Sequence, residues 1–311
     1  MNESGNALDG YKDEQMDKIQ NAIAKARAER TGPQVVGAPH FNADPASLKS
    51  RPTLDDAAQA QTVSTPTTVA TPAEVTAAWE ELKLFTPAPA RLRRNRVLTL
   101  DGGRDATDFD VLRTRILQLA KANGWRKIAI TSPGPGCGKS TTSLNLAFSL
   151  ARQRDQRTLL AEMDMRRPVL AKILGVKDKQ SMSDILSGEG TFEENAVRLD
   201  SNLMVATNAR PVARAAELLQ SASAAHALDD VMMRYDPTIA LFDMPPLLAG
   251  DDTMAFLHQV DCAILIAAAE QSTISQIDKC EQDIATQTNV MGVVLNKCRY
   301  VDRDKSYAYY E

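Results

Sequence analysis

The chain has 311 residues, of which 43% are hydrophobic and 24% charged, as in a globular protein with one large domain and flanking segments. Its formal net charge of −4 at pH 7 lacks the basic excess of dedicated nucleic-acid binders, so no nucleic-acid partner is expected. The first residues lack the basic start and apolar core of a secretory signal, and no run approaches the roughly 18 apolar residues of a membrane span. We therefore expect a cytoplasmic protein.

Four cysteines are widely spaced and form no CxxC pair. This spacing argues against a zinc site or a disulfide framework. Reduced thiols, as in the cytosol, are the expectation.

The N-terminal segment, residues 1–30, contains a predicted helix over residues 13–30. Met16, Ile19 and Ile23 recur at helical spacing, and the Thr-Gly-Pro that follows residue 30 ends the helix. The apolar stripe is narrow, so the helix needs a partner to be stable; a frayed, solvated helix is the alternative.

Residues 31–90 are predicted to be a flexible linker, because their Pro, Ala and Thr content can bury little apolar surface. A short helix over residues 73–85 places Trp79 and Leu82 on one face. Four arginines then occur in residues 91–96. They suit an anionic lipid surface or an acidic partner, although a solvated basic turn is the commoner explanation of such a run.

Residues 91–299 alternate apolar runs with helical patterns. This alternation predicts an α/β domain in which a mostly parallel sheet carries helices on both faces. Ligands in such folds bind at the carboxyl ends of the strands. The strand candidates are residues 127–131, 158–163, 203–206, 238–243, 262–267 and 290–296.

A glycine-rich segment, residues 132–141, lies between a predicted strand and a predicted helix. Its backbone N–H groups and the helix N-terminus suit a phosphate. Lys139 is predicted to reach the β- and γ-phosphates of ATP, and the Ser140 hydroxyl to bind Mg²⁺. The GxxxxGK[ST] pattern fails at one position, where Pro133 precedes Gly134.

Two predicted strands end in carboxylates. Glu162 and Asp164 lie two residues apart, so alternation places them on the same side of the chain. Asp243 ends another apolar strand, where it suits the water shell of Mg²⁺. Each acid alone fits a surface or capping role, but the two strand ends together behind a phosphate loop favour a nucleotide site.

At this point the sequence resembles the bacterial tyrosine kinases (BY-kinases of the CpsD/CapB type), within the MinD-like P-loop ATPases. The resemblance covers about residues 97–299. SPGPGCGKSTTSLNLA is similar to the family's Walker A segment, LLAEMDMRRP to its Walker A′ segment (DxDxR) and IALFDMPPLL to its Walker B segment. Partitioning ATPases of the same superfamily carry a lysine where Gly134 stands. The resemblance implies an ATP- and Mg²⁺-dependent autokinase that controls capsule or exopolysaccharide synthesis and export.

The resemblance also implies roles for residues at matching positions. Glu162 falls where the family's first A′ aspartate assists the tyrosine hydroxyl and the metal, and Asn296 falls where related ATPases contact adenine. The predicted site comprises the catalytic residues Lys139, Glu162, Asp164 and Asp243, the metal ligands Ser140, Glu162 and Asp243, and the nucleotide-binding residues Gly134, Gly136, Cys137, Gly138, Lys139, Ser140, Thr141, Arg166 and Asn296.

The C-terminal tail, residues 300–311, holds four of the six tyrosines. In the family such a cluster is autophosphorylated, so the resemblance implies Tyr300, Tyr307, Tyr309 and Tyr310 as the sites. An unanchored terminus is able to reach a neighbouring active site. The alternative is an aromatic tail that packs on the domain or binds a partner.

Two departures from the family pattern affect activity and assembly. Glu162 replaces an aspartate and is one methylene longer. The family's ExxRxxR oligomerisation motif falls at residues 107–113, where Thr107 and Asp110 replace two of its residues and Arg113 remains. Homo-oligomerisation therefore stays open.

The resemblance implies a separate membrane partner, a polysaccharide co-polymerase (Wzz-like) whose cytoplasmic tail activates the kinase at the inner face of the cell membrane. Two other functions stay open. One is a nucleotide-dependent switch of the MinD/ParA kind without tyrosine kinase activity, and the other is an ATP-holding scaffold.

Overall fold

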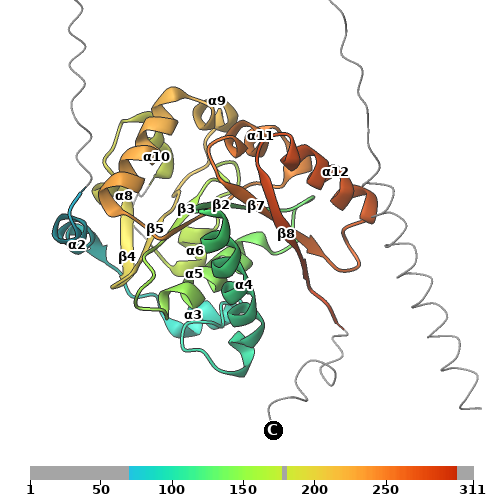
Figure 1. Ribbon diagram of the computed structural model, residues 1–311, viewed down its shortest axis with the longest axis horizontal. Coiled ribbons are helices and arrows are strands. Elements are labelled where there is room, and N and C mark those ends of the chain that lie inside the picture. Colours follow the sequence, from blue (N-terminus) through green and yellow to red (C-terminus); the bar gives the residue numbers. More distant parts are fainter. Residues whose placement is uncertain (1–69, 177–180, 300–311) are drawn as a thin grey trace, which may run out of the picture. The chain divides into compact units, whose positions relative to one another are not determined.

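The computed structural model describes residues 70–176 and 181–299. The strands in that part form one eight-stranded sheet in the order β1-β4-β5-β3-β6-β2-β7-β8 (Figure 1). Neighbouring strands are parallel except for the antiparallel pair β4–β5, so the predicted α/β class with a mostly parallel sheet is confirmed. The strands are β1 (Lys83–Leu84), β2 (Lys127–Thr131), β3 (Thr158–Glu162), β4 (Ala196–Asp200), β5 (Leu203–Ala206), β6 (Ile239–Asp243), β7 (Cys262–Ala268) and β8 (Asn289–Asn296).

All six predicted strands are present, each within one residue of its expected bounds. The sequence did not predict β1 and β4. β1 has two residues, and β4 has five that alternate between buried and exposed only weakly. Both lie at one edge of the sheet, where neighbours rather than local pattern decide pairing.

Helices cover both faces of the sheet, and a separate apolar cluster fills each side. One cluster receives residues from α2, α7–α12, and the other receives residues from α3–α6. The helices are α2 (Pro72–Glu81), α3 (Pro89–Arg94), η1 (Arg104–Ala106), α4 (Thr107–Asn123), α5 (Lys139–Ala151), α6 (Leu170–Leu174), α7 (Met182–Ser187), α8 (Phe192–Asn195), α9 (Ala215–Leu219), α10 (Ala222–Tyr235), η2 (Leu247–Ala249), α11 (Asp252–Leu257) and α12 (Ile274–Ala285).

The helix predicted inside the linker forms part of the packed domain. α2 starts with a capping box between Thr71 and Glu74, and the Trp79 indole donates a hydrogen bond of 2.7 Å to the Tyr235 carbonyl. β1 then pairs with β4. The packed unit therefore begins before residue 91. The sequence did not predict this boundary, because the average composition of residues 31–90 is that of a linker although the segment around Trp79 is buried.

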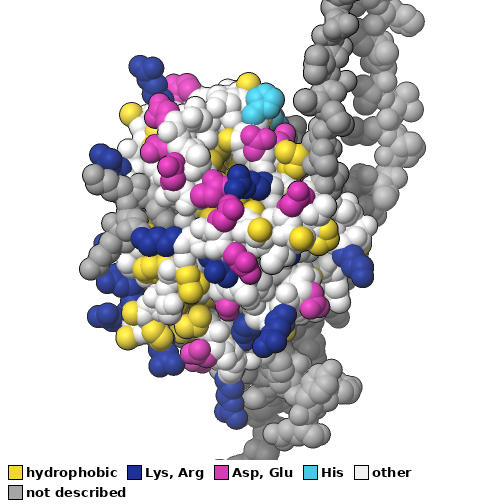
Figure 2. All heavy atoms as spheres, turned by 90° about the vertical axis from the view of Figure 1, so that its left-hand side faces the viewer, with side chains coloured by type: hydrophobic (Ala, Val, Ile, Leu, Met, Phe, Trp, Pro, Cys, Tyr) yellow, Lys and Arg dark blue, Asp and Glu magenta, His cyan; other side chains and the backbone are white. Residues whose placement is uncertain are grey.

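Three of the four arginines lie in helix α3 rather than in a turn, and Arg93, Arg94 and Arg96 are exposed to solvent, as expected for a solvated basic segment. Leu92 is buried and fixes this helix to the domain, and the Arg91 guanidinium donates to the Lys172 carbonyl at 3.2 Å. On the face shown in Figure 2, basic and acidic side chains are interspersed. Within the described residues, no helix is long and apolar enough to cross a bilayer.

The predicted helix over residues 13–30, most of the predicted linker and the four tail tyrosines lie outside the described residues.

Candidate active site

The phosphate loop connects β2 to α5, as the sequence predicts. Gly136 and Gly138 have φ values of 79° and 93°, in the left-handed region that favours glycine. A side chain at Gly138 would also clash with the Asn296 amide. Asn296 in turn donates 2.8 Å to the Cys137 carbonyl, so the end of β8 supports the loop.

A cavity of about 430 Å³ lies in front of this loop. Lys139, the first residue of α5, points its ammonium group to Asp164, with 2.8 Å between Nζ and Oδ2. Burial alone would lower the pKa of Lys139, but the carboxylates of Asp243 and Asp164 outweigh it and raise this pKa above its ordinary value. The lining includes Gly136, Lys139, Ser140, Asp164, Arg166 and Asp252.

Asp243 ends β6 beneath the phosphate loop and is fully buried. The Ser143 hydroxyl donates to its Oδ1 at 3.1 Å, whereas Oδ2 has no hydrogen-bond partner among the described residues. The Ser140 hydroxyl lies beside the carboxylate but outside hydrogen-bonding geometry to Oδ2. Burial raises the pKa of Asp243 despite the opposing effect of Lys139. A buried carboxylate oxygen without a donor is unusual in a native protein and fits a cation or its water shell.

Glu162 pairs with Asp243 in the register of β3 and β6, but its carboxylate has other partners. Three backbone N–H groups donate to it at 2.6–2.8 Å, those of Val169 and Leu170 to Oε1 and that of Asn208 to Oε2. Burial raises the pKa of Glu162 to about 7, although these three donors favour its charged form. Its side chain is buried and does not line the cavity.

Arg166 lies in the loop after β3, at the cavity, and binds a residue that the sequence did not single out. Its Nε and Nη2 donate to the two carboxylate oxygens of Asp252 at 2.5 and 2.9 Å. Asp252 opens α11 shortly after Asp243. The two consecutive acids Asp251 and Asp252, which follow the Walker B strand, could have been noted in the sequence. Their contact with Arg166 could not, because Arg166 and Asp252 are 86 residues apart in the chain.

The remaining predicted loop residues have structural contacts. Gly134 accepts a hydrogen bond from Ser132 through its carbonyl, and the Thr141 carbonyl accepts one from Asn145. The Cys137 thiol is buried, 3.6 Å from the Ser272 hydroxyl. No group of three or more His, Cys, Asp or Glu side chains arranged to hold a metal ion occurs in residues 70–176 and 181–299.

The region that corresponds to the oligomerisation motif makes contacts within the chain. Asp110 accepts from the Ser149 hydroxyl at 2.6 Å and also pairs with Arg152. Arg113 donates 3.0 Å to the Ser149 carbonyl. These groups tie α4 to α5.

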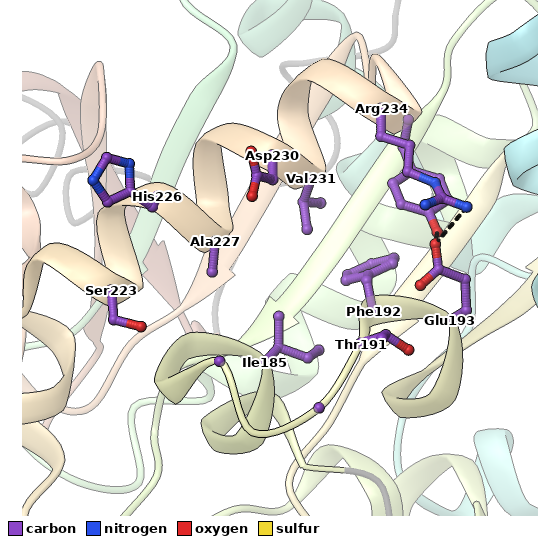
Figure 3. A pocket seen from close by; sticks show the side chains of 13 residues that line it. Ile185, Thr191, Phe192, Glu193, Ser223, His226, Ala227, Asp230, Val231 and Arg234 are labelled. Atoms are coloured by element: carbon purple, nitrogen blue, oxygen red, sulfur yellow. Dashed lines mark hydrogen bonds and ion pairs between the residues drawn. The ribbon is translucent and has the colours of Figure 1, made fainter.

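A second cavity of about 360 Å³ lies between α7, α8 and α10 (Figure 3). Arg234 and Glu193 point toward one another at one end of it, with 2.9 Å between Nη2 and Oε1. The Tyr235 hydroxyl donates to the same Glu193 oxygen at 2.6 Å. Phe192, Ile185 and Val231 supply its apolar walls.

Comparison with known proteins places this geometry among nucleotide-binding domains. The family model described as the CobQ/CobB/MinD/ParA nucleotide binding domain matches residues 128–308. Tyrosine-protein kinase CpsD of Streptococcus pneumoniae serotype 4 is 30% identical over 173 residues, which are 55% of this chain and 75% of that protein. Tyrosine-protein kinase YwqD of Bacillus subtilis (strain 168) is 26% identical over 225 residues, or 71% and 93% of the two chains. Among solved structures, the kinase domain of VpsO is 28% identical, with a TM-score of 0.55 over 62% of this chain and 96% of that one.

Proposed function

Because this chain belongs to the CobQ/CobB/MinD/ParA nucleotide-binding family, and within it to the bacterial tyrosine kinases, we propose that it is an ATP-dependent protein-tyrosine autokinase that regulates capsule or exopolysaccharide production. The observation that carries the proposal is the phosphate cavity itself. It combines a strand–loop–helix phosphate cradle, the buried Lys139–Asp164 pair and an unpartnered carboxylate oxygen on Asp243.

ATP is proposed to bind with its phosphates on the backbone N–H groups of the loop and on the N-terminus of α5. Lys139 supplies the cation for the β- and γ-phosphates. Ser140 and Asp243 are the residues that would hold Mg²⁺, which when bound neutralises phosphate charge. The free Oδ2 of Asp243 supports this assignment because it offers an oxygen that no protein donor occupies.

In the proposed reaction, the tyrosine oxygen forms a bond to the γ-phosphorus while the bond between that phosphorus and the β,γ-bridging oxygen breaks, and ADP leaves. The tyrosine proton needs an acceptor beside the cavity. Asp164 lines the cavity and is the carboxylate best placed for this step. Glu162 does not line it, so we propose that Glu162 acts by holding the backbone of residues 169, 170 and 208 around the site.

The tail tyrosines are the proposed phosphate acceptors. The tail follows β8, whose last residue Asn296 contacts the phosphate loop. Eleven further residues reach Tyr307, and an extended chain of that length spans on the order of 35 Å. The chain that follows Asn296 is therefore long enough to present a tyrosine to the site or to a neighbouring copy.

The proposed activating partner is a membrane polysaccharide co-polymerase (Wzz-like), which would recruit the chain to the inner face of the cell membrane. We also propose that the chain forms homo-oligomers, but not through the family's arginine motif. At the positions of that motif, Asp110 binds Arg152 and Ser149, and Arg113 binds Ser149, all within the same chain.

Mass spectrometry of the protein after incubation with ATP and Mg²⁺ tests the function, with Lys139→Ala as the matched control. We expect phosphate on Tyr307, Tyr309 or Tyr310, absent in the variant, and more of it when the cytoplasmic tail of the candidate partner is added. Unmodified tyrosines under both conditions, with ATP still bound, would instead support the nucleotide switch.

A further inference from the structure

The contact between Arg166 and Asp252 joins two loops that have no connection in the local sequence. Arg166 belongs to the loop after β3, and Asp252 starts α11. Two parallel hydrogen bonds fix one edge of the guanidinium, the geometry that binds arginine to carboxylates most specifically. Both residues line the phosphate cavity together with Lys139.

The two partners differ in exposure. The Asp252 side chain is 3% exposed and that of Arg166 is 51% exposed. Among the described residues, Arg166 Nη1 has no hydrogen bond, since the contacts with Asp252 use only Nε and Nη2. Asp252 thus holds the arginine while leaving donors free to bind an anion.

The loop that carries Asp252 is fixed to the phosphate loop. Leu247 N–H donates to the Ser132 carbonyl at 2.8 Å, and the Thr253 hydroxyl donates to the Pro245 carbonyl at 2.8 Å. The position of the Asp252 carboxylate, and of the guanidinium on it, is therefore set by the same backbone that forms the phosphate cradle.

We propose that Asp252 is a positioning residue that holds Arg166 beside Lys139 as a second cation for the terminal phosphate of ATP. This inference rests on the proposed use of ATP, and it goes beyond that use by assigning a role to Asp252, whose carboxylate binds the Arg166 guanidinium. A guanidinium held in place costs no reorganisation when charge develops on the transferring group. ADP lacks the γ-phosphate, so the held arginine should favour ATP over ADP.

Asp252→Asn tests this role without changing the shape of the side chain, and Asp251→Asn is the matched control. Asp251 precedes it in sequence, is 79% exposed and lies 3.6 Å from Arg166 Nη2, outside hydrogen-bonding distance. The measurement is the ratio of the Kd for ADP to the Kd for the non-hydrolysable analogue AMPPNP, with Mg²⁺. We expect this ratio to fall on the order of tenfold in Asp252→Asn with an unchanged Kd for ADP, and to stay constant in Asp251→Asn.

Arg166→Gln should lower the ratio to the same extent, and the double variant no further, because both changes remove the same interaction. Equal weakening of ADP and AMPPNP would show that Asp252 serves only the fold and would overturn the inference, as would unchanged affinities or additive losses. The binding ratio does not need kinase activity. If the tail tyrosines of the unsubstituted protein stay unmodified, the kinase proposal fails while the ratio still decides the role of Asp252.

Discussion

Two cavities of this domain, the phosphate cavity and the hollow of Figure 3, are similar in size and differ in how their charges are satisfied. In the hollow between α7, α8 and α10, Glu193 is bound by both Arg234 and Tyr235. In the phosphate cavity, Asp243 is fully buried and keeps one oxygen without a donor. Burial raises the pKa of Asp243, whereas the partners of Glu193 lower its pKa against the effect of burial.

The difference teaches which cavity is built for a ligand. A buried carboxylate oxygen without a donor costs stability, and beside a phosphate loop it fits a position that a cation or its water shell completes. By this criterion the hollow of Figure 3 is a packing feature in which α8 closes on α10, and the phosphate cavity is the site.

The comparison is tested most strongly by Asp243→Asn. The pKa of Asp243 is raised on folding, so its contribution to stability is present at low pH and is lost as the pH rises through the folded value. The neutral amide removes the buried charge. We expect the rate of ATP turnover to fall on the order of 100-fold while Tm rises, by about 2–4 °C for each kcal/mol gained.

Calorimetry and a turnover assay on the same preparation check this pair of effects. Lys139→Ala is the contrasting control, because it should lower both turnover and Tm by removing the cation that Asp164 and Asp243 share. A lower Tm in Asp243→Asn would contradict the view that this carboxylate is retained for a ligand.

A smaller effect is expected from Glu162→Gln. The glutamine amide has one oxygen instead of two, so at least one of the three backbone N–H groups loses its acceptor. A buried N–H group without an acceptor lowers the free energy of unfolding by about 1–3 kcal/mol. Because burial raises the pKa of Glu162 from 4.5 to about 7, its contribution to the free energy of unfolding is fully present below about pH 4.5 and is lost through about pH 7. The deficit of the variant should therefore be larger at pH 5 than at pH 8.

Denaturant titrations at both pH values measure this trend. Glu193→Gln is the contrasting control. The pKa of Glu193 is lowered, so its contribution is present above its ordinary pKa of 4.5 and is lost as the pH falls. Its variant should therefore show the same deficit at pH 5 and pH 8, and that deficit should shrink only as the pH falls below about 4.5. Identical trends in the two variants would remove the distinction between the cavities.

The smallest effect is expected from Tyr235→Phe in the hollow. The change removes the hydroxyl that donates to Glu193 but keeps the ring that packs on Phe192, with 4.8 Å between ring centroids. The free energy of unfolding should fall by about 0.5–1.5 kcal/mol. ATP turnover should be unchanged, and a loss of turnover would mean that the hollow communicates with the site.

Much of the fold was predictable because its signals are local. Each central strand is a short apolar run between helical patterns, and the phosphate loop has glycines where positive φ values require them, at Gly136 and Gly138. The edge elements were not predictable in the same way. β1 exists because it pairs with β4, and α2 is part of the domain because Trp79 meets the Tyr235 carbonyl.

The sequence by itself determined the phosphate loop, the acids at the strand ends and the α/β class, since each depends on residue type, spacing and alternation along a short segment. Only the tertiary structure decided what those acids bind. Glu162 accepts hydrogen bonds from three backbone N–H groups, and one oxygen of Asp243 has no donor. Arg166, which follows Glu162 in the chain, binds Asp252. Alternation places a side chain on one side of a strand, but its partner comes from a loop or helix far along the chain, and folding alone brings the two together.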